Sequence, residues 1–463
     1  MEEKKQETEE LFEDVLTPEE QKKPPEKQLN ADMPPSKPKK RNLKIVFTSI
    51  AIAVVFFVLG GFSVWLSIDK GLWTLAKIKN AIDKHYYQEI DDEDFYNALI
   101  DVINYEILDA YSEYMTADEY KQDRNGMEGK RIGIGGVFST LNEEKEPQML
   151  LTRVSGNSPA EKAGLRAGDY VTAFGKTETE LTESEVFKDF TDFLQTCEEN
   201  EEFFVRVRRG ADNILLKMSR QSYVENYLFY RTSTTAYSFG GKNAKDLQAQ
   251  GEPLTCLDGD TAYIRLTQFA GSAEERFDDL MKLFKEEGKK HLVLDLRDNG
   301  GGYVRIMQDI AKYFCKNTTD KRPLAMVADY GNVKQEFNAK GNLYSEYFTE
   351  DSRIYVLADG GTASASECLI GCMVDYGAVD FSDICLIERN GKAKTYGKGI
   401  MQTTYLMGVT GDAIRLTTAE LCWPVSGRSI HGRGVLPEDG AKTVPANFYG
   451  DGEIEAALAV LKG

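Results

Sequence analysis

The chain has 463 residues, of which 41% are hydrophobic and 28% charged, and its formal net charge is −19. This length gives room for several domains with ordinary globular cores. The acidic balance argues against a nucleic-acid partner, because binding to a phosphate backbone needs a basic surface. Seven cysteines without a CxxC pair argue against a metal cluster and against a dense disulfide scaffold. Neither a metal nor another cofactor is therefore expected.

The first 68 residues are predicted to form a tail and a membrane anchor. Residues 1–35 hold eleven acidic residues, five lysines and five prolines, a composition that buries too little apolar surface to fold. We therefore expect a disordered cytoplasmic tail over residues 1–44. Residues 45–68 are free of charge and long enough for one transmembrane helix. The Lys and Arg residues before this helix keep the N-terminus in the cytoplasm and place residues 69–463 outside.

A cleaved signal peptide is the alternative interpretation of the apolar run. The run is too long for that purpose, and no small-residue cleavage site follows it. The sequence therefore favours an uncleaved, single-pass anchor in the cell membrane.

The rest of the chain divides into three parts by its hydrophobic pattern. Residues 69–129 space their apolar residues at three and four, which is typical of surface helices. Residues 130–222 combine short strand-like runs with about two helices, as in a small compact domain. In residues 223–463, strand-like and helical runs alternate, which predicts a mostly parallel sheet covered by helices and an α/β fold made of α+β modules. The strand-like runs are TAYIRLTQF, HLVLDLR, PLAMVADY, SRIYVLADG and ICLIER.

Two serines lie at the beginning of a predicted helix in GGTASASECLIGCMVDYG, residues 360–377. Ser364 stands where a strand turns into this helix, at the edge of an open α/β sheet where ligands usually bind. Ser364 and Glu367 also fit the S-x-x-E capping box, which would make the serine a helix cap. The chain has only three histidines. The base of a catalytic serine is therefore expected to be a different residue.

Two glycine-rich segments could complete a catalytic site. In LDLRDNGGGYV, Gly300 to Gly302 lie between a strand and a helix, where bare backbone N–H groups favour an anion, although an ordinary tight turn explains them equally well. In TYGKGIMQ, Lys398 stands between two glycines. Such a lysine is normally solvated. In a dry pocket, however, its amine loses charge more easily and accepts a proton from a serine hydroxyl.

Together these segments resemble the C-terminal processing peptidases, which are membrane-associated or periplasmic serine proteases with a Ser/Lys dyad and an inserted PDZ domain. The resemblance covers about residues 75–445. It implies a ClpP/crotonase-like serine protease core at residues 223–463, with a PDZ domain inserted at residues 130–222, and an endopeptidase that cleaves proteins near their C-termini. The matching pieces, in the family's order, are YSEYM, GIGGVF, AEKAGLRAGDYV, AYIRLTQF, DLRDNGGG, TASASE, TYGKG and GRSIHGRGVLPED.

The resemblance assigns roles to individual residues. Ser364, rather than Ser366, matches the family's nucleophile. Lys398 matches the base, and Gln402 matches the glutamine that orients this lysine. The implied oxyanion-hole donors are the backbone N–H groups of Ala365 and of Gly301 or Gly302.

Three residues near the dyad are rivals for these roles. Lys392 and Lys394 compete with Lys398 because the stretch that follows Ser364 is longer than the family's pattern, but neither has the T-Y-G-K-G setting. Asp375 matches an aspartate that some family descriptions include. It lies roughly 16 Å along the helix from Ser364 at 1.5 Å per residue, so we expect it to be structural.

The PDZ-like segment implies recognition of a free C-terminus. The peptide would add as a strand, with its carboxylate held by backbone N–H groups of the loop Gly133, Ile134, Gly135 and Gly136. Arg166 is a candidate sensor that contacts the core, and a plain surface arginine is the simpler interpretation. The expected partners are protein or peptide substrates with free C-termini and the membrane, while self-association is left open.

Other functions fit the same pattern less well. A catalytically inactive PDZ scaffold on the same fold would be marked by loss of Ser364 or Lys398, and both are present. A penicillin-recognising S-x-x-K enzyme has only the string SKPK at Ser36, inside the predicted tail. A crotonase-like hydratase shares the sheet architecture but needs neither a Ser/Lys pair nor a PDZ domain.

Overall fold

The structure is a computed structural model, and it describes residues 47, 50–57, 69–142, 144–389, 391–446 and 451–463. The predicted tail lies outside these residues, as does most of the predicted span at residues 45–68. None of the helices in the described ranges combines the length and the apolar character that a bilayer crossing requires. The chain divides into two compact units, residues 1–91 and residues 92–463.

In the first unit, helix α2 (Lys70–His85) begins at a side-chain cap. The Asp69 carboxylate accepts the backbone N–H of Gly71 at 2.6 Å, which satisfies one of the N–H groups that the first turn leaves free. Lys84 and His85 lie in the last turn, where positive charge complements the helix dipole. Local sequence alone therefore explains both ends of this helix.

The second unit begins with helices, as the apolar spacing predicts. They are followed by a short strand that the pattern does not predict. Thr116 and Glu119 form a capping box that starts helix α4. The elements are α3 (Asp92–Val102), the π-helical turn η1 (Ile103–Ile107), β1 (Glu113–Met115) and α4 (Ala117–Met127).

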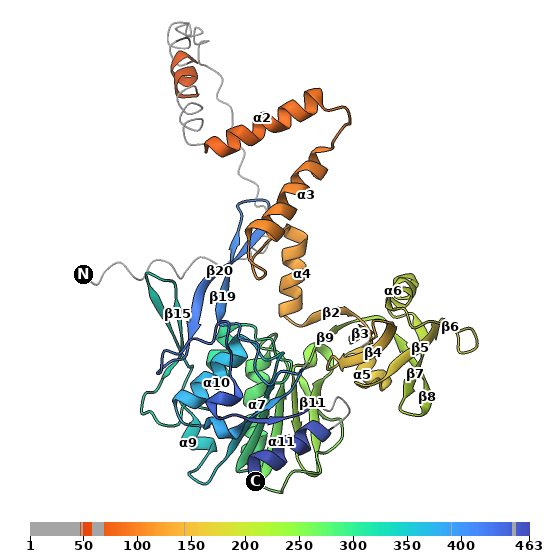
Figure 1. The fold of residues 1–463 in the computed structure, drawn as a ribbon, viewed down its shortest axis with the longest axis vertical. Helices are drawn as coiled ribbons and strands as arrows, with labels where there is room; N and C mark the ends of the chain where they lie inside the picture. The colour runs from red at the N-terminus through yellow and green to blue at the C-terminus, as the bar shows by residue number, and fades with distance from the viewer. Residues whose placement is uncertain (1–46, 48–49, 58–68, 143, 390, 447–450) are drawn as a thin grey trace, which may run out of the picture. The chain divides into compact units, whose positions relative to one another are not determined.

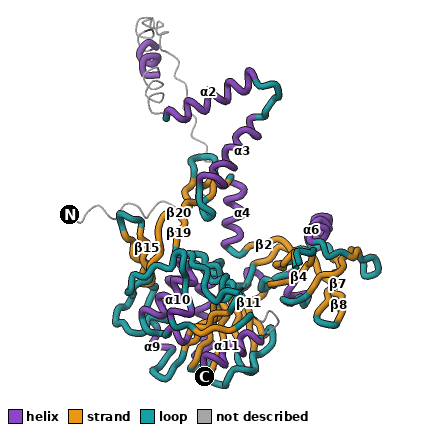
Figure 2. The backbone as a smooth tube through the Cα atoms, in the orientation of Figure 1, coloured by secondary structure: helices purple, strands orange, loops and turns teal. Residues whose placement is uncertain are grey.

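Residues 130–224 form a small module that consists mostly of strands (Figure 2). The chain enters through β2 (Lys130–Gly133) and leaves through β9 (Gln221–Val224), and these two strands pair antiparallel. Inside the module, the sheet order is β3-β4-β5-β7-β8, with β6 paired to β5. Phenylalanines from α6, β5 and β7 pack together in its core. The remaining elements are β3 (Gly136–Leu141), β4 (Pro147–Val154), α5 (Pro159–Ala163), β5 (Tyr170–Gly175), β6 (Thr182–Glu183), α6 (Phe187–Thr196), β7 (Glu202–Arg209) and β8 (Asp212–Ser219).

The large sheet of the described residues has eight strands in the order β12-β11-β10-β13-β14-β17-β18-β21. The run from β13 to β21 is parallel, which confirms the prediction from alternating strands and helices, whereas β10, β11 and β12 pair antiparallel at one edge. The strands are β10 (Leu228–Arg231), β11 (Ala236–Gly240), β12 (Asp246–Ala249), β13 (Thr261–Leu266), β14 (His291–Asp295), β17 (Ile354–Asp359), β18 (Ile384–Ile387) and β21 (Lys442–Val444).

Helices cover both faces of this sheet because alternate residues of each parallel strand point to opposite faces. In β14, Leu292 and Leu294 pack with helices α7, α8 and α10, whereas Val293 packs on the other face with α11. Figure 1 labels α7, α10 and α11 around the sheet. The helices are α7 (Ala273–Glu286), α8 (Val304–Ala311), α10 (Ala365–Asp375) and α11 (Gly452–Lys462). Shorter turns are η2 (Lys242–Ala244), α9 (Tyr344–Tyr347), η3 (Phe381–Asp383) and η4 (Pro437–Asp439).

A second, antiparallel sheet corrects one sequence-based prediction. The run PLAMVADY was predicted to join the parallel sheet, but β15 (Leu324–Asp329) pairs antiparallel with β16 (Lys334–Asn338) and β20 (Ala413–Cys422). Strand β20 also pairs with β1 and with β19 (Ile400–Leu406). A buried apolar run reveals that a strand exists but not which strand it joins.

Candidate active site

Ser364 lies at the point where strand β17 turns into helix α10. Its backbone angles are φ 55° and ψ −116°, a region that residues with a side chain rarely adopt and that costs about 1–3 kcal/mol. The backbone N–H of Ser364 donates to Oε2 of Glu367 at 3.0 Å. The turn therefore holds the serine in a strained position at the carboxyl edge of the sheet.

The two serines of this turn have different surroundings. Ser366 is fully buried, and its Oγ donates to the backbone carbonyl of Asn299 at 2.9 Å. Ser364, by contrast, lines a cleft of about 900 Å³ that also contains Lys398 and Gln402. Only Ser364 is thus available to a molecule in the cleft, and Ser366 ties the turn to the neighbouring loop.

That neighbouring loop carries the three consecutive glycines. A Cβ placed on Gly301 would lie 2.8 Å from the Cβ of Ser364, and one on Gly302 would lie 2.3 Å from the carbonyl oxygen of Phe269. Only glycine fits at either position, since both also have a positive φ. The N–H of Gly301 already donates to Oδ1 of Asn299 at 2.9 Å. Of the two glycines named as oxyanion donors, Gly302 is therefore the better candidate.

Lys398 lies in a loop whose glycines allow another segment to approach closely. A Cβ on Gly399 would lie 2.5 Å from the backbone nitrogen of His431, and one on Gly397 would lie 3.0 Å from that of Gly434. The GRSIHGRG segment therefore packs directly against the lysine loop. Neither Lys392 nor Lys394 lines the cleft that contains Ser364.

The surroundings of Lys398 lower the pKa of its amine. Burial is the largest cause, the positive charge of Arg415 acts in the same direction, and Asp109 opposes both. A lower pKa increases the fraction of neutral amine near neutral pH, which is the form that accepts a proton. Arg415 is itself paired with Glu113 and Asp123.

Glu367 connects the two loops. Its buried carboxylate accepts the N–H of Ser364 and the N–H of Lys398, both on Oε2 at 3.0 Å. Oε1 accepts the N–H of Gly397 at 2.8 Å and the hydroxyl of Thr395 at 2.5 Å. Burial raises the pKa of this carboxyl, and the four hydrogen bonds oppose the rise. The sequence indicated only a helix cap at this position, and no sequence signal revealed the link to the lysine loop.

Gln402 and Asp375, to which the resemblance gives roles, are both held by neighbours. Gln402 lines the cleft, and its Nε2 donates to Oγ1 of Thr417 at 3.3 Å. Asp375 lies at the far end of α10, where its Oδ2 accepts the backbone N–H groups of Val425 and Ser426 at 2.8 and 2.9 Å. These bonds fit the structural function that the sequence predicts for Asp375.

The predicted peptide-binding loop lies in the small module. Residues 133–136 link β2 to β3, and Ile134 is buried in the module's core. A Cβ on Gly135 would lie 2.3 Å from that of Ser158, so this turn requires glycine. Arg166 is exposed and does not line the cleft, and its backbone N–H donates to Oδ2 of Asp169 at 2.9 Å.

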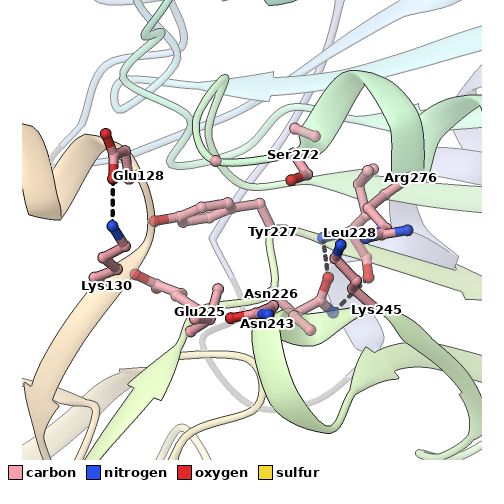
Figure 3. Close-up of a pocket in the computed structure, with 14 residues that line it drawn as sticks. Glu128, Lys130, Glu225, Asn226, Tyr227, Leu228, Asn243, Lys245, Ser272 and Arg276 are labelled. Carbon is pink, nitrogen blue, oxygen red and sulfur yellow. Dashed lines mark hydrogen bonds and ion pairs between the residues drawn. The ribbon is translucent and has the colours of Figure 1, made fainter. Parts of the chain in front are cut away.

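A second cavity, of about 300 Å³, lies where the small module joins the rest of the unit (Figure 3). Tyr227 lines it, and a Cβ on either Gly129 or Gly271 would lie 3.4 Å from the Tyr227 ring. Glu128 forms an ion pair with Lys130 at 2.6 Å. None of the predicted catalytic residues lines this cavity. The cleft with Ser364 and Lys398 is therefore the candidate active site.

Comparison with known families agrees with this choice. The model described as "Peptidase family S41" matches residues 260–439, a range that includes Ser364, Lys398 and the three glycines. Through this segment the chain is similar to peptidase family S41. This S41 segment contains the Ser364 turn and the lysine loop, but not β1, α4 or the small module.

The chain is also similar to curated proteins over a longer region. A "Probable CtpA-like serine protease" of Staphylococcus aureus (strain COL) is 27% identical over 368 residues, 79% of this chain and 64% of the relative. A protein of the same name from Staphylococcus epidermidis is 26% identical, over 83% of this chain and 70% of the relative. The chain thus spans less than two thirds of the S. aureus relative's length.

The fold of the chain is similar to that of a solved structure. The structure, from Bacteroides fragilis NCTC 9343 and assigned to the S41 proteases, is 16% identical, with a TM-score of 0.51, over 81% of this chain and 90% of the other. This similarity supports a mixed α/β architecture of the S41 type.

Proposed function

We propose that the chain is a serine endopeptidase in which the amine of Lys398 activates the hydroxyl of Ser364. The observation that carries this proposal is the arrangement of the two residues. Both line one cleft, and their backbone N–H groups donate to the same oxygen of Glu367. The similarity to peptidase family S41 and to the CtpA-like relatives supports a peptidase of the C-terminal processing type.

In the proposed mechanism, the neutral Lys398 amine takes the proton from Ser364 as Oγ attacks the substrate carbonyl. The resulting ammonium then gives this proton to the leaving amine as the C–N bond breaks, which leaves an ester on Ser364. Water hydrolyses the ester, with the same amine as base. Burial of Lys398 serves both steps, because it keeps the resting amine closer to neutrality.

The oxyanion would be held at the N-terminus of helix α10. We propose that the backbone N–H groups of Ala365 and Gly302 are the two donors. Donors fixed before the reaction stabilise the developing charge without reorganisation, and the helix dipole has the appropriate sign at this end. Packing of Gly301 against Ser364 supports this arrangement, since it keeps the two loops in contact.

Substrate recognition is proposed to involve the small module. We propose that it acts as a PDZ domain and binds the C-terminus of a protein substrate as an added strand. The carboxylate would lie at the loop of residues 133–136, and the cut would fall near the C-terminus. Arg166 remains a candidate sensor, and its exposure leaves it free to contact a bound chain or the core.

Location at the membrane is proposed from the sequence. Residues 45–68 carry no charge and follow a basic segment, which supports a single-pass anchor with the peptidase outside. Digestion of intact cells with an added protease is then expected to degrade residues after 69 and to spare the N-terminal tail. Degradation of the tail instead would refute this topology.

The function is tested with the purified full-length chain and an unfolded protein substrate. Ser364→Ala and Lys398→Ala are each expected to lower turnover by a similar factor, about 10⁴-fold or more, because a serine and its base act as one unit and the loss of either member disables both. Ser366→Ala, the matched control, is expected to keep most of its activity. A dead Ser366→Ala with an active Ser364→Ala would refute the nucleophile assignment. Substrate binding without cleavage by the wild type would indicate an inactive scaffold.

A further inference from the structure

Tyr111 contacts the catalytic lysine although it lies far outside the S41 segment. The ring centroid of Tyr111 is 4.5 Å from Nζ of Lys398. The Tyr111 hydroxyl donates to that of Tyr396 at 3.2 Å, and Tyr396 stands two positions before the lysine. Residues 110–113 line the cleft together with Ser364. One wall of the active site therefore comes from the segment that precedes β1.

Backbone contacts fix this segment in place. Strand β1 pairs with β20, with Glu113 opposite Arg415 and Met115 opposite Ala413. The hydroxyl of Ser112 accepts the backbone N–H of Thr417 at 2.8 Å. The N–H of Tyr111 donates to Oδ1 of Asp109 at 2.9 Å. The ring is thus held by its own chain and does not depend on the contact with Lys398.

Two opposing effects act on an amine that is covered by an aromatic ring. The face of the ring attracts the ammonium form, by about 0.5–2 kcal/mol. The ring also excludes water, and loss of hydration disfavours the ammonium by up to several pKa units in fully buried sites. Burial is the largest cause of the lowered pKa of Lys398. The Tyr111 ring, 4.5 Å from Nζ, is one of the groups that bury the amine.

The other charged and titratable groups around the amine come from three elements. Arg415 on β20 repels the ammonium and Asp109 attracts it, while the Glu367 carboxylate faces the lysine's backbone N–H. The hydrogen bond to Tyr396 raises the pKa of the Tyr111 phenol to about 12. Tyr111 is therefore neutral at physiological pH and does not pair with the ammonium as a phenolate.

We infer that Tyr111 is a positioning residue that completes the active site by shielding the Lys398 amine from water. The inference rests on the proposed Ser364/Lys398 mechanism and adds a residue that the S41 segment does not contain. It follows that residues 260–439 alone form an incomplete peptidase. The aromatic ring, rather than its hydroxyl, is the part that acts on the lysine.

The test compares Tyr111→Ala with Tyr111→Phe in the full-length chain. The alanine variant lets water reach the amine, so the acid limb of kcat/KM is expected to move up by about one pH unit, with activity recovered at high pH. The phenylalanine variant keeps the ring, so the acid limb of kcat/KM is expected to stay at the same pH. Tyr330→Ala removes a partly exposed tyrosine that does not line the cleft, and it serves as the matched control with no shift.

A second measurement reports on the amine without catalysis. In a Ser364→Ala background, acetylation of Lys398 by limiting acetic anhydride is followed by mass spectrometry as a function of pH. Its midpoint is expected to rise in Tyr111→Ala and to stay in place in Tyr111→Phe. If the alanine variant unfolds, Tyr111→Gln, whose shorter and polar side chain leaves the amine open to water, is expected to give a rise in the same direction.

The two measurements separate failure of this inference from failure of the proposed function. An unchanged acetylation midpoint in Tyr111→Ala, or a Tyr111→Phe that shifts as far as the alanine variant, would overturn the inference about the ring. Full activity of Ser364→Ala would overturn the proposed function instead, and the acetylation midpoint would still decide whether Tyr111 shields the amine.

Discussion

The loop that carries Ser364 and the loop that carries Lys398 are built in opposite ways. Ser364 is fixed by its own backbone, through a strained φ of 55°, a buried neighbouring serine and a glycine that packs directly against it. Lys398 is a long side chain whose properties depend on what surrounds it. Tyr111 and Asp109 come from a distant part of the chain, and Arg415 comes from the neighbouring strand β20.

The difference shows that a nucleophile and a base make separate demands on a fold. A nucleophile must point in one direction, and a strained turn achieves this locally. A lysine base must lose its charge, and this requires burial and nearby positive charge. Glu367 accepts hydrogen bonds from both loops. Substitutions around Ser364 should therefore displace its hydroxyl, whereas substitutions around Lys398 should change the pH dependence of activity.

Among substitutions that keep both Ser364 and Lys398, the largest loss of kcat is expected from Gly301→Ala, which lies beside the proposed nucleophile. The new Cβ would clash with Ser364 at 2.8 Å and with the backbone of Ala363 and Ala365 at 2.9 Å, at a φ of +98°. Displacing the nucleophile and an oxyanion donor together is expected to lower kcat by about 10³-fold. Gly300→Ala is the matched control, because a Cβ there meets no atom within 4 Å. Equal losses in the two variants would contradict the close packing.

A smaller loss is expected from Glu367→Gln, which disturbs both loops. The amide nitrogen cannot accept, so the lysine loop loses a hydrogen bond in either orientation, and the serine loop also loses one when the nitrogen replaces Oε2. A displacement of about 1 Å is expected to cost about 10²-fold in kcat. Glu119→Gln changes the matching glutamate in the capping box of α4 and should leave kcat unchanged. If both variants behave alike, Glu367 serves only as a helix cap.

The smallest effect is expected from Arg415→Gln on the lysine side. Loss of the positive charge raises the pKa of Lys398, so the acid limb of kcat/KM should move to higher pH, by up to about one unit. The plateau at high pH should remain, because the neutral amine is still formed there. Activity at pH 7 therefore falls, and activity at the plateau does not.

A control variant distinguishes the loss of the Arg415 charge from a disruption of strand β1. Glu113→Gln breaks the same ion pair but keeps the arginine, so the limb should stay or move to lower pH. A rise in both variants would mean that disruption of β1, and not the charge of Arg415, moves the limb.

Much of the fold could be predicted because its signals are local. The alternation of strand-like and helical runs along the chain predicted a parallel sheet covered by helices. The capping pattern marked the start of α10 at Ser364. Strand β15 was assigned to the wrong sheet, since its apolar run does not encode a partner.

The candidate site was predictable where its residues carry motifs and not where they depend on distant contacts. Ser364, the glycines and Lys398 stand in short motifs of fixed order. Arg415 reaches Glu113 across 302 positions, and no spacing rule connects residues so far apart. The link from Glu367 to the lysine loop likewise depends on the folded packing of two loops.

The pairing of β1 with β20 also determines when, during synthesis and folding, all walls of the cleft come together. Contacts between segments so distant in the sequence form late, because a long loop must close first. A chain is synthesised from its N-terminus, so residues 413–415 emerge long after Tyr111 and after Ser364. The ring reaches its place over Lys398 only when that pairing is made. Until then, Lys398 lacks the ring that covers its amine, and the cleft beside Ser364 lacks one of its walls.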